Sequence, residues 1–74
     1  MNATVNLKTQ QEIGKKFKET RERKNLSQEE VADGSEISTT YYAGIERGEE
    51  NPTISVVEHI CNSLNLRFRD ICPF

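Results

Sequence analysis

The chain has 74 residues, of which 34% are hydrophobic and 30% are charged, so we expect one small globular domain. No apolar run approaches the length of a transmembrane helix and the first residues do not form a secretory signal, which predicts a cytoplasmic protein with no membrane partner. The formal net charge of −2, taken alone, argues against nucleic acid as a partner.

The charge is unevenly distributed along the chain. Residues 8–24 contain seven lysines and arginines against three glutamates, whereas residues 25–74 contain three basic and nine acidic residues. DNA responds to the local potential near its phosphates rather than to total charge, so the basic segment is compatible with DNA binding. An ordinary solvated helix face explains the same run of charges.

A capping box over residues 9–12 predicts the start of a first helix that runs to about Lys24 and that Asn25-Leu26 then breaks. Within it, Ile13 and Phe17 lie four residues apart with charged residues elsewhere, which is the pattern of an amphipathic helix. We expect residues 1–8 to form a flexible arm ahead of this helix.

A second and a third helix are predicted in the middle of the chain. Another capping box at residues 27–30 starts the second helix, and Gly34 is expected to end it in the left-handed conformation. After a short turn, Ser38 is placed to cap a third helix from Thr39 to about Arg47, which Gly48 ends.

The C-terminal third predicts a fourth helix and a short fifth one. Thr53 caps the fourth helix, whose apolar residues recur at spacings of three and four: Ile54, Val57, Ile60, Cys61 and Leu64. Asn65 is expected to stop it, because asparagine tolerates the left-handed region. The fifth helix accounts for three further apolar residues: Leu66, Phe68 and Ile71. The prediction is an all-α domain of five helices over residues 9–74.

The two cysteines and the single histidine do not form a metal site, because such sites usually need four closely spaced ligands. Without an export signal we expect the thiols of Cys61 and Cys72 to be reduced, with Cys61 in the core. The sequence also lacks a nucleophile–base pair and a phosphate-binding loop. We therefore expect no enzyme activity, no metal or other cofactor, and no small-molecule ligand.

The segment from Leu26 to Gly48 contains two short helices joined by a tight turn, which is the helix-turn-helix arrangement. It resembles the phage repressor–Cro family of XRE-type regulators. That family has Leu-Ser-Gln-Glu at the second helix, Ile-Glu-Arg-Gly at the end of the third and Asn-Pro-Thr after it; here these lie at residues 26–29, 45–48 and 51–53. The resemblance extends over residues 13–71 and implies a lambda-repressor-like DNA-binding domain.

The resemblance implies roles for particular side chains. Gln28 would contact a phosphate and brace the third helix, and further phosphate contacts would come from Ser38, Arg47 and Asn51. Base edges in the major groove would face Thr39, Thr40, Tyr41 and Gly44. Arg21 and Glu46 match a buried ion pair that links the first helix to the third. The spacing agrees independently, because Tyr42 and Ile45 point to the core and leave the remaining positions outside.

Two departures from the family pattern affect the site. The turn has Ser35-Glu36 where the family usually has Leu-Gly, so either the turn is shifted or Glu36 adopts an uncommon backbone conformation. Glu49 and Glu50 add negative charge beside a loop that approaches phosphate in relatives, which predicts binding that depends on salt and pH. The third helix has no Arg, Gln or Asn before Arg47, so we expect DNA shape to carry much of the specificity.

One recognition helix covers too few base pairs to define an operator, so a homodimer on an inverted repeat is expected. Candidate interface residues are Leu66, Phe68, Ile71 and Phe74; alternatively, Leu66 and Ile71 close the monomer core. The expected function is sequence-specific binding of double-stranded DNA by an autoregulatory transcription regulator, either a restriction–modification controller or a mobile-element repressor. The alternative, favoured by the acidic C-terminal half, is a protein-interaction module such as the antitoxin of a toxin–antitoxin pair.

Overall fold

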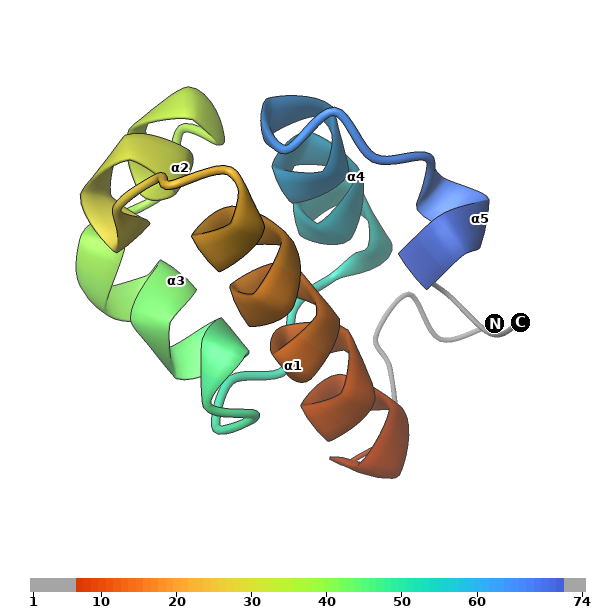
Figure 1. Ribbon diagram of the computed structural model, residues 1–74. Helices are drawn as coiled ribbons and strands as arrows, with labels where there is room; N and C mark the ends of the chain where they lie inside the picture. Colours follow the sequence, from red (N-terminus) through yellow and green to blue (C-terminus); the bar gives the residue numbers. More distant parts are fainter. Residues whose placement is uncertain (1–6, 72–74) are drawn as a thin grey trace.

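The computed structural model of the chain describes residues 7–71. Five helices make up this part: α1 (Leu7–Arg23), α2 (Gln28–Gly34), α3 (Thr39–Glu46), α4 (Ile54–Ser63) and α5 (Phe68–Ile71) (Figure 1). This architecture confirms the all-α prediction. None of these helices combines the length and the hydropathy needed to cross a membrane.

The start of α1 differs from the prediction. The helix already includes Leu7, so Thr9 lies inside it and the predicted capping box at residues 9–12 is wrong. Thr9 and Gln10 are both buried within the helix. Residues 7 and 8 therefore belong to α1 and not to the expected arm, whose residues 1–6 lie outside the described part of the chain.

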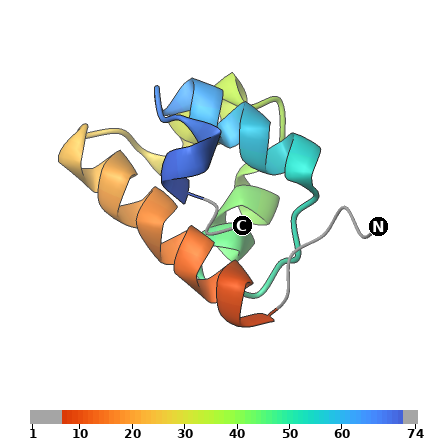
Figure 2. The same cartoon turned by 90° about the vertical axis from the view of Figure 1, so that its right-hand side faces the viewer.

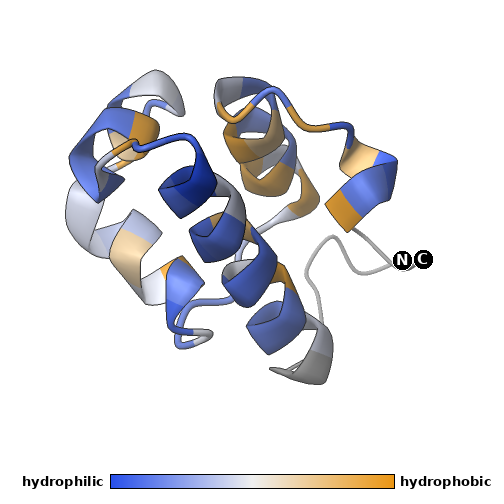
Figure 3. Cartoon of the chain, in the orientation of Figure 1, coloured by the Kyte–Doolittle hydropathy of each residue, from blue (hydrophilic) through white to orange (hydrophobic). Residues whose placement is uncertain are grey.

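The helices enclose one core. In Figure 1, α2 and α3 lie on one side of α1 and α5 on the other, and the view in Figure 2 agrees, with α5 in front and α3 behind. Contacts join α1 to α3, α2 to both α3 and α4, and α4 to α5. The buried hydrophobic residues are Ile13, Phe17, Val31, Ala32, Tyr42, Ile45, Val57, Ile60, Cys61, Leu64 and Ile71. Much of the apolar sequence lies on α4, whereas the visible side of α1 is hydrophilic (Figure 3).

Four helices end in the same way, on a residue in the left-handed conformation. The φ angles are 57° at Asn25, 61° at Glu36, 75° at Gly48 and 57° at Asn65. In each case the next N–H donates to a carbonyl five residues earlier, as in a Schellman motif. The predicted stops at Asn25, Gly48 and Asn65 are confirmed. The prediction for Gly34 is wrong, because Gly34 is the last residue of α2 and Glu36 takes the left-handed position.

Two glycines allow helices to approach closely. A Cβ atom on Gly14 would collide with the backbone carbonyl oxygens of Ile45 and Glu46, so α1 lies directly against the end of α3. A Cβ atom on Gly34 would lie 2.7 Å from the Ser63 hydroxyl oxygen, where α2 meets α4. These contacts fix α2 and α3 against the rest of the domain.

Candidate nucleic-acid interface

The start of α2 is fixed by the predicted capping box. The Ser27 hydroxyl oxygen accepts a hydrogen bond from the Glu30 N–H at 3.0 Å, and the Glu30 carboxylate accepts one from the Ser27 N–H at 2.8 Å. These two bonds satisfy backbone donors that a helix start otherwise leaves unpaired. The box holds Gln28 at the first position of α2.

The turn between α2 and α3 is held by local hydrogen bonds. The buried Ser35 hydroxyl donates to the Val31 carbonyl at 2.8 Å, and the Ile37 N–H donates to the Ala32 carbonyl at 3.0 Å. The Ser38 hydroxyl then accepts from the Tyr41 N–H at 3.1 Å and caps α3, as predicted. Of the two possibilities for the turn, the structure has the uncommon backbone conformation at Glu36.

The two sides of α3 have opposite environments. Tyr42 and Ile45 face the core and are 0% and 1% exposed. On the outer side, Thr39 and Thr40 are exposed and Tyr41 is half-buried. The outer side therefore presents the side chains of two threonines and part of a tyrosine side chain.

Gly44 does not share this exposure. The side chain of Glu50 lies over it, such that a Cβ atom on Gly44 would be 2.5 Å from the Glu50 Cγ. Gly44 is buried, whereas Glu50 is exposed. The structure thus corrects the expectation that Gly44 is open to a ligand, because Glu50 occupies that position on the outer side of α3.

An ion pair holds the inner side of α3 to α1. The Arg21 Nε lies 2.6 Å from the Glu46 Oε2, and the two side chains are 13% and 2% exposed. Two more donors complete the cluster: the second Arg21 nitrogen, Nη2, reaches Oε1 at 3.2 Å, and the Gln28 amide reaches it at 3.0 Å. Arg21 also donates to the Leu26 carbonyl at 2.8 Å. This cluster, comprising Arg21, Gln28 and Glu46, links α1, α2 and α3.

The pKa shifts in the cluster follow from these contacts. Burial by itself raises the pKa of the Glu46 carboxyl, but the hydrogen bonds from Arg21 and Gln28 and the charge of Arg21 lower it, and the net shift is downward. The hydrogen bond to Glu46 raises the pKa of Arg21. Both groups are therefore charged at neutral pH, and the pair predicted from the sequence is present.

Gln28 was expected to brace the third helix and to contact a phosphate. Its amide nitrogen donates to Glu46, so it does brace α3. An amide nitrogen has two hydrogens, so this bond leaves one for a phosphate. Ser38 and Asn51 are exposed. Arg47 forms a surface ion pair with Glu49 at 2.9 Å. The phosphate contacts of these four residues remain predictions.

Sequence reasoning missed how the loop after α3 is held. The Gln10 amide donates to the Gly48 carbonyl at 3.0 Å, and Gly48 packs so closely on Gln11 that a Cβ atom there would lie 2.7 Å from the Gln11 Cγ. The sequence contains two adjacent glutamines, and nothing in the pattern indicates which one reaches the loop. The anchored loop positions Glu49 and Glu50 beside α3.

The predicted dimer residues divide into two groups. Ile71 is 8% exposed and packs in the core, so the alternative in which it closes the monomer is the one observed. Leu66 and Phe68 are half-buried, and Phe68 borders a shallow depression lined also by Glu58, His59, Cys61 and Asn62. Phe74 lies outside the described residues.

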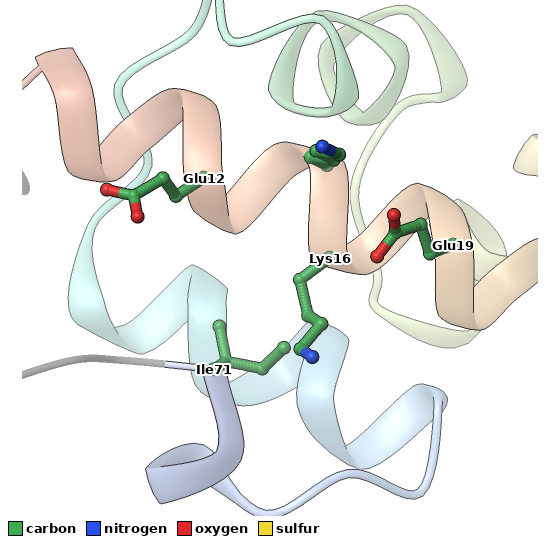
Figure 4. A pocket seen from close by; sticks show the side chains of 5 residues that line it. Glu12, Lys16, Glu19 and Ile71 are labelled. Carbon is green, nitrogen blue, oxygen red and sulfur yellow. The ribbon is translucent and has the colours of Figure 1, made fainter.

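A second depression lies between α1 and α5, on the side of α1 away from α3 (Figures 1 and 4). Lys16 extends from α1 toward Ile71 of α5, and Glu12 and Glu19 flank it (Figure 4). Its charges are mixed, so it is neither a basic surface for phosphate nor an apolar pocket.

Comparisons with known proteins agree with this geometry. The Helix-turn-helix family matches residues 17–71, and the chain therefore belongs to that family. The control protein C.BamHI of Bacillus amyloliquefaciens is 32% identical over 63 residues, which cover 84% of this chain and 78% of that protein. The immunity repressor of Bacillus phage phi105 is 31% identical over 55 residues, which span 74% of this chain but only 38% of the repressor.

Solved structures share the fold. The restriction-modification controller protein C.AhdI from Aeromonas hydrophila superposes with a TM-score of 0.81 at 29% identity, covering 84% of this chain and 94% of that one. The controller protein C.Esp1396I, solved as a tetramer with its natural 35-base-pair operator, has a TM-score of 0.78 at 31% identity. That match covers 84% of this chain and 86% of the controller chain.

Proposed function

We propose that this protein is a transcription regulator that binds a specific sequence in double-stranded DNA, with α3 in the major groove. The main observation in support of this proposal is the contrast between the two sides of α3. Residues 39–41 line its outer side, while Tyr42, Ile45 and the ion pair of Glu46 lock the opposite side into the domain. A helix fixed in this way can enter a groove without losing its own packing.

Family membership and the relatives support this proposal. The similar proteins are a phage repressor and restriction-modification controllers, one of them solved with its operator. The proposed role is therefore binding and regulation in the cytoplasm, without enzyme activity. The geometry favours a DNA-reading helix over the alternative of a toxin-binding module.

We further propose that the regulator acts as a homodimer on an inverted repeat, because one α3 reads too few base pairs. Leu66 and Phe68 are the interface candidates, since both are apolar and only half-buried. The substitution Phe68→Glu should shift sedimentation toward the monomer and weaken operator binding while leaving the helical circular dichroism unchanged. An unchanged dimer would place the interface elsewhere.

The DNA-binding proposal is tested by measuring the affinity for the protein's own upstream region and for random duplexes at several salt concentrations. The variant Thr40→Glu places a negative charge on the outer side of α3, and its matched control is Lys16→Gln. Both lower the net charge by the same amount, but Lys16 lies on the side of α1 away from α3. Thr40→Glu should abolish specific binding and Lys16→Gln should leave it nearly unchanged. Equal losses, or no binding by the wild type at low salt, would overturn the proposal.

A further inference from the structure

Glu50 occupies an unexpected place on the outer side of α3. Its backbone N–H donates to the Gly44 carbonyl at 3.2 Å, which brings the residue back over the helix. A Cβ atom on Gly44 would lie 2.5 Å from the Glu50 Cγ and 3.3 Å from its Oε2. Because glycine has no side chain, the Glu50 side chain can lie flat across this turn of α3. The Glu50 side chain therefore packs directly against Gly44.

The Glu50 carboxylate also lies near Tyr41. Burial is the main reason that the pKa of the Tyr41 hydroxyl is raised, and the negative charge of Glu50 adds to it. The carboxylate therefore shares the outer side of α3 with the residues expected to meet base edges.

Within the part of the chain that the structure describes, the negative charge of Glu50 is not neutralised by an ion pair, unlike the charge of the adjacent Glu49. Glu49 forms an ion pair with Arg47, whereas no salt bridge joins Glu50 to another side chain among residues 9–71. Tyr41, which lies near it on the outer side of α3, is neutral. An exposed carboxylate thus lies on the part of α3 that is expected to contact a base edge.

Carboxylates accept hydrogen bonds and cannot donate them. In the major groove, guanine offers the acceptors N7 and O6, thymine offers O4 and a methyl group, and adenine offers its amine beside the acceptor N7. Cytosine offers the amine N4 without an adjacent acceptor, and it is the base that glutamate and aspartate read.

We propose that Glu50, whose side chain packs on Gly44, determines the DNA-sequence specificity of the protein. Its carboxylate accepts a hydrogen bond from the N4 amine of one cytosine in each half-site. This inference rests on the proposed function and names a base contact within it. The loop that carries Glu49 and Glu50 then helps to select the DNA sequence, in addition to repelling phosphates.

The test is selection of bound duplexes from a random pool, followed by affinity measurements on single-base variants of the selected site. The wild type, Glu50→Gln and the matched control Glu49→Gln are compared. The control removes the same charge from the same loop but from a residue that pairs with Arg47 rather than lying over α3. Circular dichroism establishes that the three proteins are equally folded.

The wild type should require cytosine at one position of each half-site, with a loss of roughly tenfold when it is replaced. Glu50→Gln should lose that preference or shift it to adenine, which glutamine contacts through N6 and N7. Glu49→Gln should keep the wild-type preference at every position. If Glu50→Gln selects the same sequence as the wild type and differs only in overall affinity, this inference is wrong while DNA binding stands. If the wild type selects no sequence at all, the proposed function fails and the inference fails with it.

Discussion

Removing one partner of the ion pair in the cluster of Arg21, Gln28 and Glu46 should greatly destabilise this small domain. We consider removing either partner of its ion pair, as Arg21→Met or Glu46→Gln. Stranding one member of a buried pair typically costs about 3–5 kcal/mol, because the remaining charge loses its partner without regaining water. A domain of this size has a total stability of roughly 0.05–0.15 kcal/mol per residue, so one such change removes much of it.

The structure predicts which change costs more. The Glu46 side chain is 2% exposed and Arg21 is 13% exposed, so a stranded carboxylate has less access to water than a stranded guanidinium. Arg21 also keeps its hydrogen bond to the Leu26 carbonyl when Glu46 is changed. We expect a loss of about 4 kcal/mol for Arg21→Met and about 3 kcal/mol for Glu46→Gln. The double variant should lose less than the sum, with a coupling of about 2 kcal/mol.

The assay is urea unfolding of the wild type, both single variants and the double variant. The control is the same cycle on Arg47 and Glu49, whose side chains are 56% and 62% exposed. That surface pair should show a coupling below about 1 kcal/mol. In thermal scans each lost kcal/mol should lower the midpoint by about 4–8 °C. A coupling between Arg21 and Glu46 no larger than that of the surface pair would refute the reasoning.

Three further predictions follow from particular contacts. Glu36→Gly should raise the free energy of unfolding by about 0.5–1 kcal/mol, because the left-handed conformation costs a residue with a Cβ about 1–2 kcal/mol and glycine's extra entropy returns part of it; urea unfolding measures this, and lower stability would contradict it. Gly14→Ala should instead lower stability by about 1–3 kcal/mol, since the new methyl group meets the carbonyls at the end of α3, whereas Lys15→Ala at the adjacent exposed position should be nearly neutral. The pKa of Glu46 lies below the value of 4.5 for a free carboxyl, so its contribution is present above pH 4.5 and is lost as the pH falls through the lowered pKa. Urea unfolding against pH should show this decline, and Glu46→Gln should remove that part of it; an identical profile in the variant would count against the assignment.

Most of the fold was predictable because its signals are local. The capping box at Ser27 and the helix stops at Asn25 and Asn65 each depend on hydrogen bonds or backbone angles within a few residues. The apolar spacing likewise identified the core residues of α4. Gly34 was misread because a glycine near a helix end has two uses: here it permits a close contact with Ser63, while Glu36 takes the left-handed position.

The candidate site was less predictable because it depends on contacts between distant segments. Residues 38–41 were placed correctly relative to the core, since the spacing within one helix determines which side they occupy. The position of Glu50 over Gly44 was not foreseeable, because it depends on how the loop folds back after Gly48. That loop is in turn held by Gln10, which lies in the first turn of α1 and is 38 residues away from Gly48 in the sequence. No short-range pattern reveals this contact.

The most direct test of the central claim, that the outer side of α3 meets duplex DNA, is a nuclear magnetic resonance titration of the isotope-labelled protein with a selected duplex. The largest amide shift changes should fall on Gln28 and on residues 38–41, with little change on the side of α1 that carries Lys16. Changes concentrated on α1 or α5, with residues 38–41 unaffected at saturation, would contradict the account.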